Sequence, residues 1–530
     1  MLRQFKLMKY NMSLSPLREA RWPKFIVAFG FLALACFYSM WAWTDRLTDL
    51  GGDSAAYLII SRLYSLYHAP STVVLAYKDG IVSPPLFPFL LSLADGGYHF
   101  LAAHLVVAFF ALASVAALYF WLRAQSWNIW LGAAIALIFA LLPATILTIF
   151  NIWTEFPYLF FSLASIAALE WGEQSPASST RAWYVGAVMV ACASLIRVAA
   201  LPLLAAFLLH LLIRRPRRFV AIGLVAALPF AAWALYSSLA ETGAGSYVNH
   251  FVNVYSSDPV GKFITQCRVE YGAVFATWQA GWLGGSFSGL LHTLVTGFWF
   301  LCIAGWLYRL ASLKFDALYT LLYAILLFLW PHPEEAARYA FVLYPILIAN
   351  AFQLIAALAK HVPGMRNQLG IAGLAVGVML LCALPGTAIN TKRFLDTPDE
   401  YLAARHTQGW YGEDQFSTKG FAQFQNRFFN DLAGLDKFVP PGECVFAIKP
   451  TIIWLLTDRR SMGPPGTALN DEQFNKGIKQ CRFAYVIPFS STTFGKTFYP
   501  MDRLGERATI INRVNDDAGG LDAALLEIKQ

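Results

Sequence analysis

The stretch TDRLTDLGGDSAAYLIISRLYSLYHAPSTVVLAYKDGIVSPPLFP, residues 44–88, follows the first long apolar segment directly and decides the fold. Its four acids are Asp45, Asp49, Asp53 and Asp79. The sequence DLGGD at 49–53 predicts a turn, and residues 55–67 predict an amphipathic helix that lies on a membrane surface. Carboxylates at a bilayer boundary are costly unless they bind a partner, so we expect the chemistry of the protein in this stretch.

The composition indicates a polytopic α-helical membrane protein. Of the 530 residues, 57% are hydrophobic and 14% charged, whereas a soluble protein has roughly 25% charged residues. Apolar runs predict about 11 transmembrane helices. They lie near 24–43, 98–122, 129–149, 155–170, 183–199, 200–213, 219–240, 289–308, 317–331, 339–360 and 369–390. The segment 183–213 fits one long span or a hairpin of two, and both remain open here.

The distribution of lysine and arginine predicts the orientation. The first 24 residues contain six basic residues and one acid, which places the N-terminus in the cytoplasm. The first span lacks a small-residue cleavage site, so we expect it to stay as a signal anchor of a multi-pass protein in the cell (inner) membrane. The net charge of +8 reflects this distribution and does not indicate a nucleic-acid partner.

We expect two domains. Residues 1–390 form a transmembrane domain with outer loops 44–97 and 241–288, and residues 391–530 form a small extracytoplasmic α/β domain with more charge. In this tail, 444–448 and 482–488 predict strands and 451–458 predicts a short helix. Cys444 and Cys481 each stand at a strand start, so parallel neighbouring strands would allow a disulfide in an oxidising compartment.

Polar groups at three further positions on the predicted outer side each have two possible roles. Glu155 opens the fourth apolar run, as a helix N-terminal acid or as part of a site. Arg197 interrupts an apolar stretch, where it needs a carboxylate or phosphate partner or snorkels to the interface. The sequence EEAARY at 334–339 fits a solvated helix cap or a phosphate-binding site.

The aromatic residues of loop 241–288 fit a surface that binds a sugar or a lipid headgroup, or an aromatic belt at the membrane interface.

Absent motifs exclude several enzyme classes. The sequence contains no Walker loop, no GxSxG and no dinucleotide fingerprint, and its predicted cytoplasmic loops are short. A cytosolic nucleotide-using catalytic domain is therefore not expected. No CxxC or His-Cys cluster indicates zinc. Whatever is bound is handled on the outer face or within the membrane.

Short motifs in a common order resemble the GT-C superfamily of membrane glycosyltransferases, in particular the aminoarabinose and mannosyl transferase group. They are DLGGDSAAY at 49–57, SPPLFP at 83–88, Thr154-Glu155, Arg197 with Pro202, EAARY at 335–339, and IKP at 448–450 with LTDRR at 456–460. The resemblance covers nearly the whole chain in layout. It implies transfer of a sugar from a polyprenyl-phosphate carrier to an outer acceptor, which is a glycan, glycolipid or protein, in the cell envelope or periplasm.

The resemblance also implies roles for named residues. Displacing polyprenyl phosphate from an anomeric carbon in an inverting reaction requires a carboxylate base and positive charge on the leaving phosphate. We expect Asp53 as the base or as an acid that positions the substrate, with Asp49 as the second candidate and Asp45 as the third. Arg197 and Arg338 are the expected phosphate ligands. The substrate-binding residues that we expect are Asp45, Tyr57, Lys78, Glu155, Arg197, Glu335, Arg338 and Tyr339.

The acids depart from the family pattern, because many relatives carry an adjacent Asp-Glu pair and this chain spaces its acids at 45, 49 and 53. The identity of the base and the use of a divalent cation therefore stay open, and no other cofactor is expected. Two alternatives are a flippase or transporter of a lipid-linked saccharide and a saccharide polymerase or ligase. Acids clustered on the outer side favour the transferase over the transporter.

Overall fold

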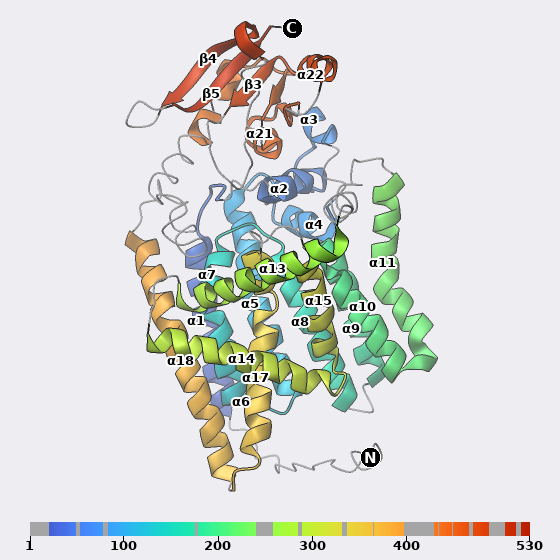
Figure 1. The fold of residues 1–530 in the computed structure, drawn as a ribbon, viewed down its shortest axis with the longest axis vertical. Coiled ribbons are helices and arrows are strands. Elements are labelled where there is room, and N and C mark those ends of the chain that lie inside the picture. Colours follow the sequence, from blue (N-terminus) through green and yellow to red (C-terminus); the bar gives the residue numbers. More distant parts are fainter. Residues whose placement is uncertain are drawn as a thin grey trace.

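Helices build the body of the protein, and a five-stranded sheet lies at one end of it (Figure 1). The computed structural model describes residues 21–48, 53–77, 83–174, 179–239, 258–284, 289–330, 336–363, 365–396, 429–432, 434–447, 449–465, 470–486, 504–515 and 521–529. All structural statements below concern these residues. This architecture confirms the expected fold class, a helical membrane protein with a small C-terminal α/β part.

Each of the predicted apolar runs coincides with a helix or a bent helix pair. These are α1 Arg21–Ala42, α5 Phe100–Ala124, α6 Ile129–Ala140 with α7 Pro143–Ile149, α8 Glu155–Gln174, α9 Ser179–Ile196, α10 Leu201–Arg214, α11 Phe219–Leu239, α14 Leu290–Leu310, α15 Phe315–Leu329, α17 Tyr344–Ala359 and α18 Met365–Asp396.

Fewer of these helices have the length and composition of a full membrane crossing. Among the described residues 5 helices do, and 6 if α6 and α7, which meet at a bend of 61°, count as one span. The 5 are Trp22–Ala42, Phe100–Ala124, Pro216–Leu239, Leu290–Leu310 and Leu369–Asp396. Others, such as α10 with 14 residues, are shorter than the roughly 20 residues that a perpendicular crossing needs.

The segment 183–213 forms two separate helices. Arg197, in extended backbone between α9 and α10, pairs with Glu155 at the first residue of α8. His210, near the end of α10, instead pairs with Glu173 near the last residue of α8 at 2.9 Å. Because the two contacts lie at opposite ends of α8, α9 and α10 run antiparallel as a hairpin.

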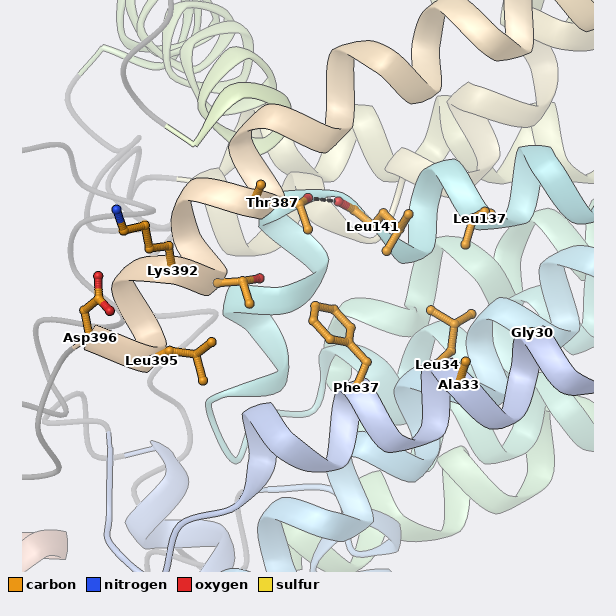
Figure 2. Close-up of a pocket in the computed structure, with 12 residues that line it drawn as sticks. Gly30, Ala33, Leu34, Phe37, Leu137, Leu141, Thr387, Lys392, Leu395 and Asp396 are labelled. Carbon is orange, nitrogen blue, oxygen red and sulfur yellow. Dashed lines mark hydrogen bonds between the residues drawn. The ribbon is translucent and has the colours of Figure 1, made fainter.

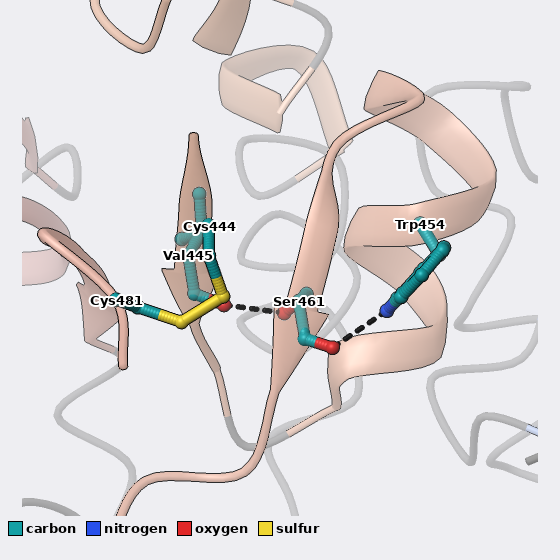
Figure 3. The surroundings of a disulfide bond; sticks show 5 residues. All are labelled: Cys444, Val445, Trp454, Ser461 and Cys481. Carbon is teal, nitrogen blue, oxygen red and sulfur yellow. Dashed lines mark hydrogen bonds between the residues drawn. A yellow bond between two sulfur atoms is a disulfide. The ribbon is translucent and has the colours of Figure 1, made fainter. Parts of the chain in front are cut away.

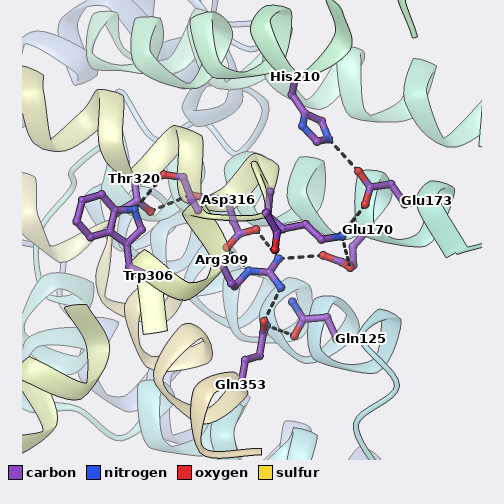
Figure 4. A network of polar contacts seen from close by, with 12 residues as sticks. Gln125, Glu170, Glu173, His210, Trp306, Arg309, Asp316, Thr320 and Gln353 are labelled. Atoms are coloured by element: carbon purple, nitrogen blue, oxygen red, sulfur yellow. Dashed lines mark hydrogen bonds and ion pairs between the residues drawn. The ribbon is translucent and has the colours of Figure 1, made fainter. Parts of the chain in front are cut away.

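A buried ionic network ties α8, α14 and α15 together at the end of α8 away from Glu155 (Figure 4). The Arg309 guanidinium bonds to Asp316 and to Glu170, the latter at 3.0 Å. Lys314 donates to Glu173 at 2.7 Å. Since removing one member of a buried pair leaves an uncompensated charge, this network fixes the relative position of the three helices.

Three short helices lie between the helical body and the sheet (Figure 1): α2 Asp53–Leu63, α3 Thr72–Leu75 and α4 Leu86–Leu93. The expected surface helix is present as α2, which begins earlier and ends earlier than residues 55–67. Ala55, Leu58 and Ile59 are buried on one side of it, whereas Asp53 at its start is exposed. Burial of one face therefore anchors α2 and leaves its first residue open to solvent.

The segment expected as a second outer loop contains an unforeseen helix, the 25-residue α13 Pro259–Leu283. Trp278 and Trp282 of this helix are fully buried. The Trp278 ring packs edge-on against Tyr344 with centroids 5.0 Å apart. The expectation of a sugar face or an interfacial belt is therefore wrong for these two rings, because α13 turns them into the core between α14 and α17.

The C-terminal sheet has the strand order β2-β1-β3-β5-β4. Its elements are β1 Cys444–Phe446, α21 Pro450–Thr457, β2 Arg460–Met462, α22 Asp471–Ile478, β3 Phe483–Val486, β4 Ala508–Asn515 and β5 Leu521–Ile528. The strand β1 is parallel to β2 and β3, and β5 is antiparallel to β3 and β4. The two strands and the helix expected in the tail are present, and the other three strands were not foreseen.

A disulfide joins Cys444 to Cys481 beside the parallel part of the sheet (Figure 3). Next to it, the Ser461 hydroxyl donates to the Val445 carbonyl at 2.7 Å, and the Trp454 indole donates to the Ser461 carbonyl at 2.6 Å. The strands β1 and β3 are parallel neighbours, which is the condition that the sequence analysis gave for this bond while leaving its formation open.

The sheet domain contacts the short helices directly through α21. Ser71, which caps α3, donates to Asp458 at 2.9 Å. The Trp454 ring packs edge-on against Tyr77 with centroids 5.3 Å apart. These contacts hold α21 against the segment that joins α2 to α4.

Candidate active site

Four charged side chains from distant parts of the chain meet in one ionic chain. The Arg338 Nη1 atom lies 2.6 Å from the Asp53 Oδ2 atom, and its Nε atom lies 2.6 Å from the Glu155 Oε1 atom. The Arg197 Nη1 atom lies 3.0 Å from the same Glu155 oxygen. The order is therefore Asp53–Arg338–Glu155–Arg197, with acids and bases alternating.

Three of these side chains stand at or next to a helix end, where the backbone changes direction. Asp53 is the first residue of α2 and Glu155 the first residue of α8, and acids are favoured at such N-terminal positions by the helix dipole. Arg197 follows the last residue of α9, and Arg338 lies within α16 Ala336–Phe341. Helix ends at one level of the bundle thus bring together residues that are up to 285 positions apart.

One end of the ionic chain is buried and the other end is exposed to solvent. The side chains of Glu155 and Arg197 are 1% and 8% exposed, whereas that of Asp53 is 51% exposed. A buried carboxylate between two guanidinium groups compensates charges that would otherwise be costly in an apolar surrounding. Glu155 accordingly positions both arginines, and Asp53 is the acid that reaches solvent.

Aromatic rings surround both guanidinium groups. Arg197 lies over Tyr339 and Tyr158, at 4.9 Å and 5.9 Å from the ring centroids. Arg338 lies over Trp153 at 4.7 Å. The faces of these rings attract the cations, so the arginines are held in place on several sides.

The positive surroundings act on the Asp53 carboxyl. Partial burial works to raise the pKa of Asp53, but the charge and hydrogen bond of Arg338, assisted by the charges of Lys449 and Arg197, outweigh it and hold this pKa below its ordinary value. Lys449 belongs to the sheet domain, just before α21. The C-terminal domain therefore contributes positive charge at this site.

A cavity of about 440 Å³ opens at the ionic chain. Its lining residues are Asp53, Ala56, Tyr57, Ser83, Pro84, Ile196, Arg197, Val198, Ala199, Leu201, Tyr323, Leu326, Leu327, Trp330, Arg338 and Tyr339. Charged groups gather at one part of this lining, and apolar side chains of α15 and of the segment 196–201 form much of the rest. Such a cavity accepts a ligand with an anionic group joined to an apolar chain.

The structure brings together most of the residues that the sequence singled out. Asp53, Tyr57, Arg197, Arg338 and Tyr339 line the cavity, and Glu155 lies against it through both arginines.

Asp45 is exposed and does not belong to this lining. Asp49, Lys78 and Glu335 lie outside the described residues.

Other contributors were missed by the sequence analysis. Ser83 and Pro84 line the cavity, and they stood in a quoted motif without a site role. Tyr323 lines the cavity and donates from its hydroxyl to the Tyr339 carbonyl at 3.2 Å. Its spacing in an apolar run gave no signal, because aromatic residues make up 15% of the chain.

A larger hollow of about 720 Å³ lies between α1, α6 and α18 (Figure 2). Its lining is mostly apolar, from Leu34 and Phe37 of α1 to Leu395 of α18, with Lys392 and Asp396 near one end. None of the expected site residues lines it. The smaller cavity is therefore the candidate active site.

Comparison with known proteins finds matches to the structure and none to the sequence. The sequence matches no family profile and no curated protein. The structure matches ArnT from Cupriavidus metallidurans in the apo state with a TM-score of 0.50 and 14% identity, over 94% of this chain and 97% of that chain. The chain has the GT-C fold.

Two further GT-C structures align less closely. ArnT from Cupriavidus metallidurans bound to undecaprenyl phosphate gives a TM-score of 0.48 at 15% identity, over 94% of this chain and 97% of that chain. The archaeal oligosaccharyltransferase AglB from Archaeoglobus fulgidus, in complex with an inhibitory peptide and a dolichol-phosphate, gives 0.48 at 13% identity, over 86% and 69%. The match to apo ArnT shows the GT-C fold that the short motifs led us to expect.

Proposed function

We propose that the protein is a glycosyltransferase that moves a sugar from a polyprenyl-phosphate carrier to an acceptor at the outer face of the membrane. The observation that carries this proposal is the cavity in which an exposed carboxylate, Asp53, lies beside the Arg338 and Arg197 guanidinium groups and continues into an apolar lining. The GT-C fold supports it. The ArnT that shares this fold has also been crystallised with undecaprenyl phosphate.

The donor fits the cavity by its chemistry. Its phosphate oxygens would bind the Arg197 and Arg338 guanidinium groups, whose planar forks match phosphate geometry. Its prenyl chain would follow the apolar wall formed by Leu201, Leu326 and Leu327. The sugar, between the phosphate and solvent, would then lie near Asp53.

The reaction is a displacement at the anomeric carbon. An acceptor hydroxyl forms the new carbon–oxygen bond while its proton passes to the Asp53 carboxylate, and the bond to the phosphate oxygen breaks. The leaving polyprenyl phosphate takes the electron pair, and the arginines stabilise its added negative charge. Attack opposite to the leaving group inverts the anomeric configuration.

The ion pair between Asp53 and Arg338 couples donor binding to the base. With Arg338 at 2.6 Å, the pKa of Asp53 is low, and such a carboxylate is a weak base. A donor phosphate that engages Arg338 would compete with Asp53 for the same guanidinium. Its negative charge would also raise the pKa of Asp53, so the carboxylate would become a stronger base when the donor is present.

The proposal includes an orientation. The disulfide between Cys444 and Cys481 is typical of an oxidising compartment, which supports an extracytoplasmic C-terminal domain. The sheet domain lies at the same end as Asp53, through Lys449 and α21. We therefore infer a cytoplasmic N-terminus and a site at the outer face.

The test is a turnover assay on the purified protein in nanodiscs. A panel of hexose- and pentose-bearing polyprenyl phosphates would be offered with glycan, glycolipid and peptide acceptors, and released polyprenyl phosphate would be measured. We expect donor-dependent release that falls about 10²–10⁴-fold in Asp53→Asn. The matched control is Asp436→Asn, because Asp436 is an exposed acid near the sheet and outside the cavity lining.

Each outcome distinguishes a function. Release that is unchanged by Asp53→Asn overturns the assigned base. Tight donor binding without release, combined with movement of donor between leaflets, indicates a flippase or transporter. Growth of a chain of repeats that persists in Asp53→Asn indicates a polymerase or ligase.

A further inference from the structure

We propose that His68, Asp95 and His99 form a binding site for a divalent metal ion, with zinc as the ion that fits best. One ligand atom from each residue can be chosen so that all lie within 4.8 Å of one another. The Asp95 Oδ2 atom lies 3.0 Å from the Nε2 atom of His68 and 3.4 Å from that of His99. Two imidazoles and one carboxylate thus converge on one point.

These separations suit tetrahedral zinc. Bonds of about 2.0–2.1 Å in tetrahedral geometry place neighbouring ligand atoms roughly 3.3–3.4 Å apart. The distance from Asp95 to His99 matches this value, and the distance from Asp95 to His68 is slightly shorter. The ligand atoms of the two histidines lie within 4.8 Å of each other, so side-chain rotations would bring the three groups to tetrahedral separations.

The backbone prepares Asp95 and His99 for a shared ligand. Asp95 has a φ of 54°, in the left-handed region that few non-glycine residues adopt. The carbonyl of Asp95 accepts from the amides of Tyr98 and His99 at 3.1 Å and 3.0 Å. This single turn brings the side chains of Asp95 and His99 to the same side.

His68 reaches the other two residues from a separate segment. Its backbone amide donates to the Ser65 hydroxyl at 3.2 Å, and its ring packs on Tyr98 with centroids 4.3 Å apart. Nearby, the Tyr67 hydroxyl donates to the Leu93 carbonyl at 3.0 Å. The imidazole is therefore held in place before any ion binds.

Exposure and ligand type also favour zinc. His68 and His99 are 47% and 69% exposed and Asp95 is 15% exposed, so an ion has an entry path. Neutral imidazole and carboxylate are common zinc ligands. Among the described residues the cluster holds three protein ligands, and water would take the fourth position.

The position of the site indicates a structural role. It lies just beyond the C-terminal end of α2, where the Arg62 Nε atom also donates to the Gly97 carbonyl at 2.8 Å. The 11 residues of α2 span about 16 Å, which separates the site from Asp53. An ion here would clamp the segment after α2 to the turn between α4 and α5, and it would not touch the sugar.

The experiment measures zinc binding by the full-length protein without a polyhistidine tag. The protein is stripped with a chelator, dialysed and titrated with zinc sulfate by calorimetry. Cobalt(II) spectra then report the coordination geometry. The variants are His68→Ala/His99→Ala and Asp95→Asn, and the matched control is His361→Ala, an exposed histidine after α17. Melting temperatures without metal check that every variant is folded.

We expect wild type and His361→Ala to bind about one zinc ion per chain, with a rise in melting temperature on binding. The double histidine variant should lose this binding and the rise, and Asp95→Asn should weaken both. No saturable binding by wild type overturns the proposal, as does unchanged stoichiometry in a folded double histidine variant. None of these outcomes depends on glycosyltransferase activity.

Discussion

Arg338 bridges Asp53 and Glu155 with two different nitrogen atoms, Nη1 and Nε, each 2.6 Å from a carboxylate oxygen. One guanidinium thus joins the exposed acid of the cavity to the buried acid beneath it. A lysine ammonium is a point charge and cannot present two nitrogens in this fixed geometry. The relationship explains why an arginine is needed at position 338.

Arg338→Lys should keep the positive charge and lose the bridge. We expect kcat to fall about 10²–10³-fold, comparable to the loss of one preorganised donor at a site of developing charge. Steady-state kinetics in the turnover assay measures this change. Arg482→Lys is the matched control, since Arg482 pairs with Glu527 on the sheet domain. An Arg338→Lys enzyme with wild-type kcat would contradict a direct role in binding the leaving phosphate.

Glu155→Gln should destabilise the protein. Glu155 is the buried counter-charge for both Arg197 and Arg338, and removing one partner of a buried pair costs about 3–5 kcal/mol. Denaturant unfolding followed by tryptophan fluorescence measures the change. Glu506→Gln, at an exposed acid of the sheet domain, should leave stability within about 0.5 kcal/mol. Equal stability of the two variants would show that Glu155 is not the compensating charge.

The charged part of the site was accessible from sequence for a physical reason. Acids and arginines beside apolar spans are costly, so Asp53, Glu155, Arg197 and Arg338 stand out against their surroundings. Their pairing was not accessible, because it depends on which helix ends share a level of the bundle. The structure supplies this pairing through contacts between α2, α8, α9 and α16.

Aromatic residues show where sequence reasoning fails. Trp278 and Trp282 suggested a surface role but are fully buried, whereas Trp153 and Tyr323 attracted no attention and belong to the site. A ring in an apolar chain has the same pattern whether it packs in the core or lines a cavity. Only the tertiary arrangement of α13 and α15 distinguishes these cases.

The pH dependence should differ between kcat/KM and kcat. In the free protein the pKa of Asp53 lies below its ordinary value, so its ionisation favours the folded state above the unfolded pKa of about 3.9. That contribution is lost only as pH falls through the lower folded pKa. The value of kcat/KM reports the ionisation of the free enzyme. Protonation of Asp53 should therefore cause no decrease in kcat/KM as the pH is lowered from about 8 to 5.

Donor binding should move the acid limb, which is the loss of activity at low pH as Asp53 is protonated, to higher pH in kcat, which reports the enzyme–substrate complex. The physical reason is the transfer of Arg338 from Asp53 to the donor phosphate. Full pH–rate profiles of wild type and of the control Asp436→Asn, at an exposed acid, measure the loss of activity at low pH in both parameters. An acid limb at the same pH in kcat and kcat/KM would argue against competition between Asp53 and the donor for Arg338.

The disulfide should stabilise the sheet domain. It closes a loop with a sequence separation of 37 residues, for which chain entropy predicts about 4 kcal/mol. Cys444→Ser/Cys481→Ser should therefore lower the midpoint of unfolding of this domain. Proteolysis of folded protein at rising temperature measures it, with Cys36→Ser, at an exposed free cysteine of α1, as control. Equal protease resistance of the double variant and the control would show that the bond adds no stability.

Lys449, which belongs to the sheet domain, should strengthen the binding of the donor in the cavity. Its charge lowers the pKa of Asp53, and it therefore adds to the positive field that a donor phosphate meets. Lys449→Gln should weaken donor binding by about fivefold, the equivalent of the roughly 1 kcal/mol that two charges exchange in a water-rich setting. Because solvent ions screen such an interaction, the difference from wild type should shrink as salt rises. Donor binding measured in low and high salt tests this, with Lys437→Gln, at an exposed lysine of the same domain, as control. A loss that is equally large at high salt would point to a direct contact with the donor and away from a field effect.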